Sequence, residues 1–202
     1  MSSWTFAAQV LPHFLIAAVA TAVGFSWSLR VAPEWTLPLG LAAFVLFLAS
    51  VTFRRSAGWN AAFFYLFAIA AGAFFGRILP VGGLGWGWAA AIAIAILAAM
   101  AAAGRAALYR RLVALWTGLW VLSWIYLGGW FVIFGMRMEP IIGIPWAAAG
   151  ILIFALLGLS TFSRLRIPEQ RPVAVSLGLE LYILTFNLAI AAKLLGHGLG
   201  VH

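Results

Sequence analysis

The chain has 202 residues, of which 66% are apolar and 8% are charged, and its net charge is +8. Because a soluble domain carries roughly a quarter charged residues, this composition predicts an integral membrane protein, in which Arg reports topology rather than nucleic-acid binding. The absence of Cys excludes disulfides, thiolate chemistry and Cys-type zinc sites. The absence of Asp leaves few carboxylates for a metal site built from carboxylate ligands.

Seven apolar stretches are long enough to cross a membrane as helices, since about 20 such residues span the core of a bilayer. Each break between them contains Pro, Gly or Arg, which is typical of connections between helices. The predicted fold class is all-α, a polytopic integral membrane protein with seven transmembrane helices in one bundle, and residues 1–202 form a single transmembrane domain. The spans are predicted at residues 10–29, 37–53, 59–79, 84–103, 112–134, 144–162 and 173–195.

The first predicted span contains one His, His13, which follows Pro12 near its start. An imidazole can ligate haem iron or chlorophyll magnesium, but no other predicted span contains a His that could complete such a site. We therefore interpret His13 as a polar anchor, and we predict neither a metal site nor a cofactor.

Small residues mark the third and fourth predicted spans. Gly72 and Gly76 are four residues apart in "GAFFG", a spacing that lets a neighbouring helix approach closely. The fourth span reads "AAAIAIAILAAMAAAG" and has almost no bulky side chains, which predicts a central helix surrounded by neighbours. The alternative for such small-residue surfaces is a dimerisation face.

The fifth predicted span carries an aromatic stripe, because Trp116, Trp120 and Trp124 follow one another at intervals of four residues. One interpretation is packing against lipid or a neighbouring helix. The alternative is a face for a partner helix or a flat hydrophobic ligand, so a bound pigment or lipid stays open.

The last predicted span contains an acid, Glu180, roughly 10 Å along the helix axis from its start. Ser176, Glu180, Leu184 and Asn187 share one helical face, so we expect Glu180 and Asn187 to point into the bundle. We expect Tyr182 to point elsewhere. An ionisable residue inside a membrane span suggests a functional site by default.

Two interpretations of Glu180 remain open. It is either a structural acid, protonated or paired with Arg54, Arg55 or Arg164, or a group that gates or links the protein to proton movement. Burial raises the pKa of a carboxyl group, and a nearby Arg lowers it. A carboxyl group balanced between these two effects can act as a pH switch.

Basic residues are distributed unequally over the two sides of the predicted bundle. Eight Arg residues lie in the connections after the second, fourth and sixth spans, against four basic residues on the opposite side. The positive-inside rule makes the first group cytoplasmic, so the amino terminus is predicted inside and the carboxyl terminus outside. The first group is Arg54, Arg55, Arg105, Arg110, Arg111, Arg164, Arg166 and Arg171, and the second is Arg30, Arg77, Arg137 and Lys193.

Three stretches in this order resemble the transmembrane Bax inhibitor motif family, which includes seven-helix bacterial members. "FRRSAGWNAAFFYLFAIAAGAFFGRIL" is similar to the junction of the second and third helices in that family. "GILIFALLGLSTFSRLRI" is similar to its sixth helix and the basic exit from it. "SLGLELYILTFNLAIAAKLLG" is similar to its seventh helix.

The resemblance implies a pH-sensitive ion leak linked to calcium and stress control, in a bacterial inner membrane. The family has a latch of two Asp residues and a basic residue. The Asp positions fall here on Thr161 and Leu184, so the acidic pair is missing, while Tyr182 and Asn187 match the pattern. Arg54 or Arg55 occupies the basic position, and Glu180 lies one turn before Leu184. With one carboxylate, a calcium site would be weak.

Two functions therefore remain. The first is a pH-sensitive ion-leak or stress protein with Glu180 as its gate and with Asn187, Arg54, Arg55, Thr161 and Tyr182 as further polar candidates. The second is a non-catalytic accessory subunit of a larger respiratory, photosynthetic or protease assembly, for which the Trp stripe is the partner face. The bilayer is the expected partner in both. Enzyme activity is not expected, because the sequence lacks a nucleophile–base pair, a metal cluster and a phosphate loop.

Overall fold

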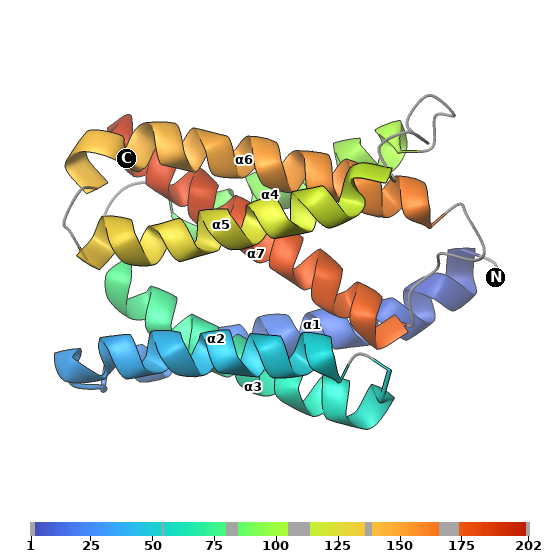
Figure 1. The fold of residues 1–202 in the computed structure, drawn as a ribbon, viewed down its shortest axis with the longest axis horizontal. Helices are drawn as coiled ribbons and strands as arrows, with labels where there is room; N and C mark the ends of the chain where they lie inside the picture. The colour runs from blue at the N-terminus through green and yellow to red at the C-terminus, as the bar shows by residue number, and fades with distance from the viewer. Residues whose placement is uncertain are drawn as a thin grey trace. The chain divides into compact units, whose positions relative to one another are not determined.

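The computed structural model describes residues 3–53, 55–79, 85–104, 114–135, 139–165 and 174–200, and these form helices without any strand. A helix lies on each of the seven predicted spans, which confirms the predicted fold class (Figure 1). The helices are α1 (Ser3–Ser28), α2 (Thr36–Thr52), α3 (Ala57–Ile78), α4 (Trp86–Ala103), α5 (Trp116–Gly135), α6 (Glu139–Arg164) and α7 (Ala174–Gly198), with a short 3-10 helix η1 (Pro33–Trp35) before α2.

Within the described part of the chain, six helices are long and apolar enough to cross a membrane: α1, α2, α3, α4, α6 and α7. The helix α5 has 20 residues and remains a predicted span. Four helices (α1, α2, α3 and α6) begin earlier than predicted, α1 and α6 by more than one turn, because a helix can continue past the apolar region that the span prediction measures. The helix α6 begins with Glu139 and Pro140, which are residue types favoured in the first turn of a helix.

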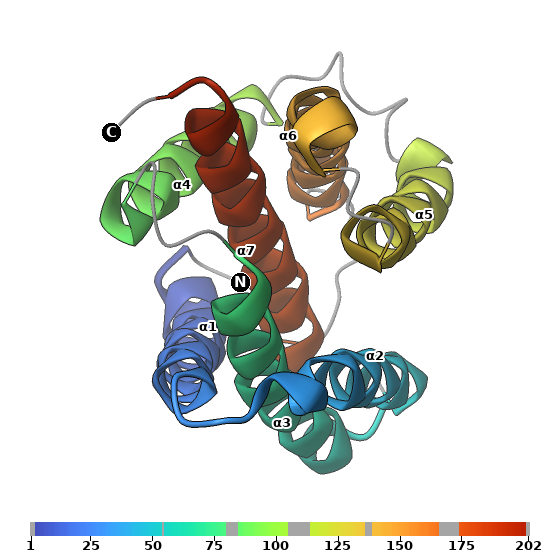
Figure 2. The same cartoon turned by 90° about the vertical axis from the view of Figure 1, so that its left-hand side faces the viewer.

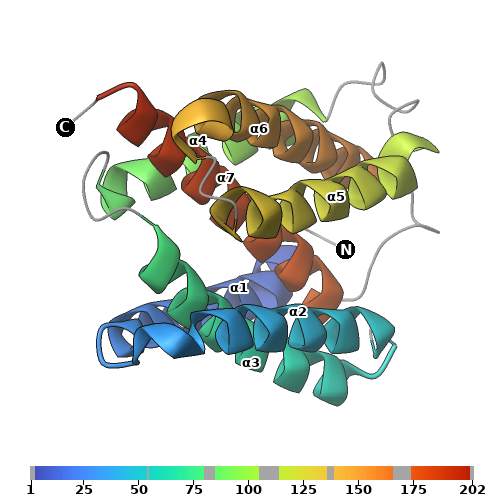
Figure 3. The ribbon, with the colours of Figure 1, turned by 60° about the vertical axis from the view of Figure 1, so that its left-hand side comes forward.

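The chain divides into two compact units, and α7 contributes to both. Unit 1 contains residues 1–79 and 172–182, and its helix α3 packs against both α1 and α2 (Figure 2). Unit 2 contains residues 80–171 and 183–202, and its helix α6 packs against both α4 and α5 (Figure 3).

In unit 1, glycines bring the backbones of α1 and α3 together. A Cβ atom on Gly72 would collide with the carbonyl oxygen of Thr21, and one on Gly24 would collide with the carbonyl oxygen of Ile69. One turn further along α3, a Cβ on Gly76 would collide with the hydroxyl of Ser28. The predicted close approach at Gly72 and Gly76 is therefore confirmed, and α1 is the helix that makes it.

The predicted central position of the fourth span is wrong. The buried residues of α4 are Ala89, Ala93 and Leu97, which form one stripe at intervals of four residues. Only 11% of its membrane-span window is buried, against 72% for α7, the most buried helix. Ala-rich sequence does not separate the two cases, because small side chains suit both a crowded interior and a thin surface helix.

Aromatic side chains fill the contact between α5 and α6 in unit 2. Tyr126 of α5 lies over Gly150 of α6, and Trp146 of α6 lies over Gly129 of α5, so each ring occupies space that a side chain would otherwise take. The two rings stack with centroids 5.3 Å apart and an interplanar angle of 8°. This reciprocal arrangement fixes the register of the two helices.

Contacts near the helix ends show that successive helices run in opposite directions within each unit. In unit 1, Ser50 near the end of α2 and Asn60 near the start of α3 lie with Ser176 near the start of α7. In unit 2, Trp116 in the first turn of α5 lies beside Arg164 in the last turn of α6. Arg55 lies in the turn at this end of unit 1, and Arg164 lies at the corresponding end of unit 2. The side of the membrane on which these ends lie stays a prediction.

Candidate functional site

A buried acid lies in the most buried helix. Glu180 of α7 is 8% exposed, and it belongs to the part of α7 that packs in unit 1. The expected inward orientation of Glu180 agrees with this burial. Water solvates a carboxylate far better than a protein interior does. A buried Glu must therefore be protonated, or its carboxylate must have polar or charged groups around it.

A layer of neutral hydrogen bonds joins three helices of unit 1. The hydroxyl of Ser50 donates to Asn60 Oδ1 over 2.8 Å, and Asn60 Nδ2 donates to the hydroxyl of Ser176 over 3.1 Å. Asn60 is fully buried, and its amide suits this place because it both accepts and donates. This Ser50–Asn60–Ser176 layer was not predicted, although Asn60 is a lone amide at the start of an apolar span, and that signal could have revealed it.

The layer separates Glu180 from the Arg-bearing end of unit 1 along the helix axis. Glu180 follows Ser176 by four residues, which is about 6 Å further along α7. Arg55 lies in the turn between α2 and α3, beyond the layer, and is exposed. Arg54, the other predicted partner, lies outside the described residues.

Tyr182 corrects the prediction that only one face of α7 points inward. Its side chain is buried, and its hydroxyl hydrogen-bonds that of Thr21 in α1. Its ring packs edge-on against Phe64 and Phe67 of α3. The helix α7 is covered by protein on the face that carries Tyr182 as well as on the face that carries Glu180. Two residues on different faces of α7 are therefore both buried.

A second polar contact joins α1 to α3. His13 Nδ1 lies 2.6 Å from the hydroxyl of Tyr65. Gly178 of α7 lies against the Cβ of His13, so the glycine makes room for this side chain. The contact fits the interpretation of His13 as a polar anchor between helices.

The remaining polar candidates lie in unit 2. Asn187 of α7 is buried and donates to the carbonyl oxygen of Ile183 over 2.8 Å, so its amide is engaged by its own helix. Thr161 of α6 is fully buried, and its hydroxyl has no hydrogen-bond partner within the described part of the chain. The predicted candidate set is therefore divided: Glu180, Tyr182 and Arg55 belong to unit 1, while Thr161 and Asn187 belong to unit 2.

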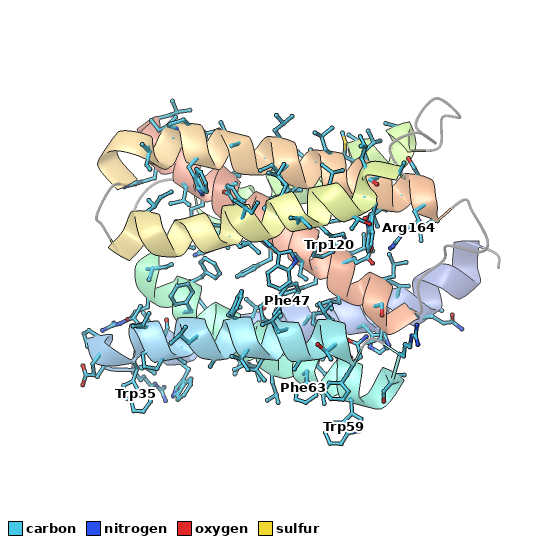
Figure 4. The ribbon with its side chains drawn as sticks, in the orientation of Figure 1. Trp35, Phe47, Trp59, Phe63, Trp120 and Arg164 are labelled. Atoms are coloured by element: carbon cyan, nitrogen blue, oxygen red, sulfur yellow. The ribbon has the colours of Figure 1, made fainter. Side chains whose placement is uncertain are left out.

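The Trp stripe begins at a contact between α5 and α6. The guanidinium of Arg164 lies 4.0 Å from the ring centroid of Trp116, and the rings of Trp116 and Trp120 meet edge-on at 5.9 Å. Figure 4 shows Arg164 at the end of α6 and Trp120 on α5. Trp116 thus packs against a neighbouring helix, and Trp116, Trp120 and Trp124 are all half-buried. The pairing of Arg164 with Glu180 stays a prediction.

Lys193 is a second ionisable side chain buried in α7. It is 2% exposed, and its Nζ lies 5.5 Å from the ring centroid of Trp86 at the start of α4. The sequence prediction used Lys193 only to count charges on one side of the membrane. Lys193 is the sole Lys of the chain and lies within an apolar span, and this position could have indicated that its side chain is buried.

No protein family, curated protein or solved structure matches the chain. Among the described side chains, no group of three His, Cys, Asp or Glu residues lies together as a metal site would need.

The arrangement in unit 1 is suited to a change of charge rather than to bond-making chemistry. One carboxyl group is buried in α7, and hydroxyl and amide groups connect the nearby helices. A carboxyl group can exchange a proton, while the neutral layer can form hydrogen bonds with water, and its oxygen atoms can coordinate a cation.

Proposed function

We propose that the protein is a pH-sensitive ion-leak protein of the Bax inhibitor-like kind, with Glu180 as its gating group. The observation that carries the proposal is the burial of Glu180 in α7, the helix with the largest buried share. Ionisable side chains inside membrane spans are costly and rare, and they mark ion and proton pathways in channels and pumps.

The proposed mechanism follows from the charge of one side chain. A deprotonated Glu180 favours water or a cation in unit 1, because burying a carboxylate away from water costs free energy. Protonation at low pH removes that charge and favours dry packing between α7, α1 and α3. The leak therefore changes with pH through the protonation of Glu180, and the Ser50–Asn60–Ser176 layer lies about one helical turn away along α7.

The ion is proposed to be a proton or a monovalent cation. Calcium prefers six to eight oxygen ligands, several of them carboxylates, and the chain has only four Glu residues and no Asp. Of these four, Glu34 lies in the exposed helix η1, and Glu180 is the only one inside a predicted span.

The accessory-subunit hypothesis has less support. It needs an apolar outer face, and α1, α2 and α4 do expose large apolar side chains such as Val19, Leu37 and Trp88. Lipid requires the same surface of any membrane protein, so this exposure does not favour a partner protein. The first residue of the Trp stripe is also covered by Arg164 of the same chain. No catalytic activity is proposed.

Ion flux into proteoliposomes tests the proposal. The purified protein is reconstituted, and proton and potassium flux are followed from about pH 7.5 to about pH 5. The wild type is expected to leak with a rate that depends on pH, and Glu180→Gln is expected to lose that dependence because an amide does not titrate. Glu34→Gln, the same chemical change at an exposed site, should behave as wild type. An inactive wild type, or an unchanged pH profile in Glu180→Gln, would overturn the proposal.

A further inference from the structure

His13 lies where three helices of unit 1 meet. It belongs to the membrane-span candidate Ala8–Ser28 of α1, and Tyr65 belongs to the candidate Ala57–Ile78 of α3. Nδ1 of His13 lies 2.6 Å from the hydroxyl of Tyr65, and the planes of the two rings are inclined by 23°. Gly178 of α7 lies against the Cβ of His13. The imidazole therefore joins α1 to α3 at a point that α7 also contacts.

The hydrogen bond between His13 and Tyr65 differs between the two charge states of the imidazole. In the neutral ring, Nδ1 either accepts a hydrogen bond from the Tyr65 hydroxyl or donates one to it, since one ring nitrogen is a donor and the other an acceptor. In the charged ring both nitrogens are donors, so Tyr65 must accept. A hydrogen bond from a charged donor is roughly twice as strong as one between neutral groups. Protonation of His13 is therefore expected to strengthen this contact.

The imidazole can take up a proton while its contact with Tyr65 persists. The second ring nitrogen, Nε2, makes no hydrogen bond within the described part of the chain, and the His13 side chain is half-buried. Histidine is the side chain whose ordinary charge change falls between about pH 5 and about pH 8. The Tyr65 hydroxyl has no second hydrogen-bond partner among the described residues, so removal of this hydroxyl reports on the bond to His13.

The helices packed against His13 supply few other ionisable groups. The helix α1 itself contains no Asp, Glu, Lys or Arg. In α3, Arg77 lies twelve residues beyond Tyr65, which is about 18 Å along the helix axis. In the part of α7 that belongs to unit 1, the ionisable side chains are Glu180 and Tyr182. A change in the charge of Glu180 must therefore be separated from a change in the charge of His13.

We propose that the hydrogen bond between His13 and Tyr65 is a pH-sensitive contact that draws α1 and α3 more tightly together when the pH falls. This contact makes His13 a second proton-binding group of unit 1, on a different helix from Glu180. The two groups act in the same direction, because protonation of Glu180 favours dry packing between the same helices. Any effect of His13 on the leak rests on the proposed function, whereas the contact itself does not.

The loss of stability caused by Tyr65→Phe, measured at two pH values, tests the contact without any measurement of ion flux. This change removes the hydroxyl and keeps the ring. The full-length protein is unfolded reversibly in mixed micelles at about pH 7.5 and about pH 5, as the wild type and in two further backgrounds. His13→Asn replaces the imidazole by an amide that does not titrate, and Glu180→Gln does the same for the carboxyl group. Tyr182→Phe is the matched control, because it removes a hydroxyl that hydrogen-bonds the neutral Thr21 in the same unit.

In the wild type, Tyr65→Phe is expected to lower the free energy of unfolding about twice as much at the lower pH as at the higher pH, as a charged donor implies. The same ratio is expected in the Glu180→Gln background. In the His13→Asn background, Tyr65→Phe should have equal effects at the two pH values, and so should Tyr182→Phe in the wild type. An equal or smaller effect of Tyr65→Phe at the lower pH would refute the proposed contact. A twofold ratio that His13→Asn retains, or that Glu180→Gln abolishes, would refute it as well. The proposed leak is decided separately, by the flux assay.

Discussion

Gly72→Ala is expected to lower the free energy of unfolding by about 3 kcal/mol, at the upper end of the usual cost of overpacking a core. The new methyl group would collide with the carbonyl oxygen of Thr21, which is backbone and cannot rotate away. The helices α1 and α3 would have to separate, and the opposing contact between Gly24 and Ile69 would be lost with them. Reversible unfolding in mixed micelles, followed by circular dichroism, measures this loss.

Gly58→Ala is the matched control for Gly72→Ala. Gly58 lies in the same helix, α3, and a Cβ built there has no atom within 4 Å. Alanine has the better helix propensity, by about 0.5–1 kcal/mol, so this variant should be as stable as the wild type or slightly more stable. Equal stability of the two variants would contradict the close packing of α1 on α3.

Asn60→Leu is expected to lower the free energy of unfolding by about 2 kcal/mol, since it breaks both hydrogen bonds of the Ser50–Asn60–Ser176 layer. Two hydroxyl groups would stay near an apolar side chain in a buried place. The cost is moderate because a Ser hydroxyl can turn to a carbonyl of its own helix, and because hydrogen bonds between membrane helices average less than about 1 kcal/mol each. The same unfolding assay applies.

Two comparisons isolate the layer. The amide of Asn187 donates to a carbonyl oxygen of its own helix. We expect Asn187→Leu to lower the free energy of unfolding less than Asn60→Leu does. Adding Ser50→Ala and Ser176→Ala to Asn60→Leu should restore part of the stability, because the hydroxyl groups left without Asn60 are then removed as well. A cost for Asn187→Leu as large as that for Asn60→Leu, with no recovery in the triple variant, would count against a bridging role for Asn60.

The sequence predicted the helices because continuous apolar runs of membrane-spanning length have few other structures available in a bilayer. It also predicted the close approach at Gly72 and Gly76, because two small residues one turn apart create a flat strip on a helix. It did not predict which helix fills that strip. Nor did it predict that α4 has only one buried stripe, since an Ala-rich helix lacks the contrast between large and small side chains that marks a buried face.

The burial of Glu180 was predictable, because one acid in an apolar span is conspicuous. Its surroundings were not. Asn60 and Ser176 are 116 residues apart in the chain, and Thr21 and Tyr182 are 161 apart. Neither pair has a periodicity or motif that joins its members. Arg164 shows the same limit, because nothing in the sequence joins it to Trp116 in α5, the aromatic ring that it contacts.

The position of Glu180 inside the membrane depends on seven crossings, so the sides on which the connections lie are the most direct test. The chain has no Cys, and single Cys residues can replace Ala32, Arg55 and Gly200, which are exposed. An impermeant thiol reagent is applied to intact cells and to inverted vesicles. Labelling of positions 32 and 200 from outside and of position 55 only from inside is the predicted result. Labelling of 55 and 200 from the same side would contradict it, because an odd number of crossings must separate them.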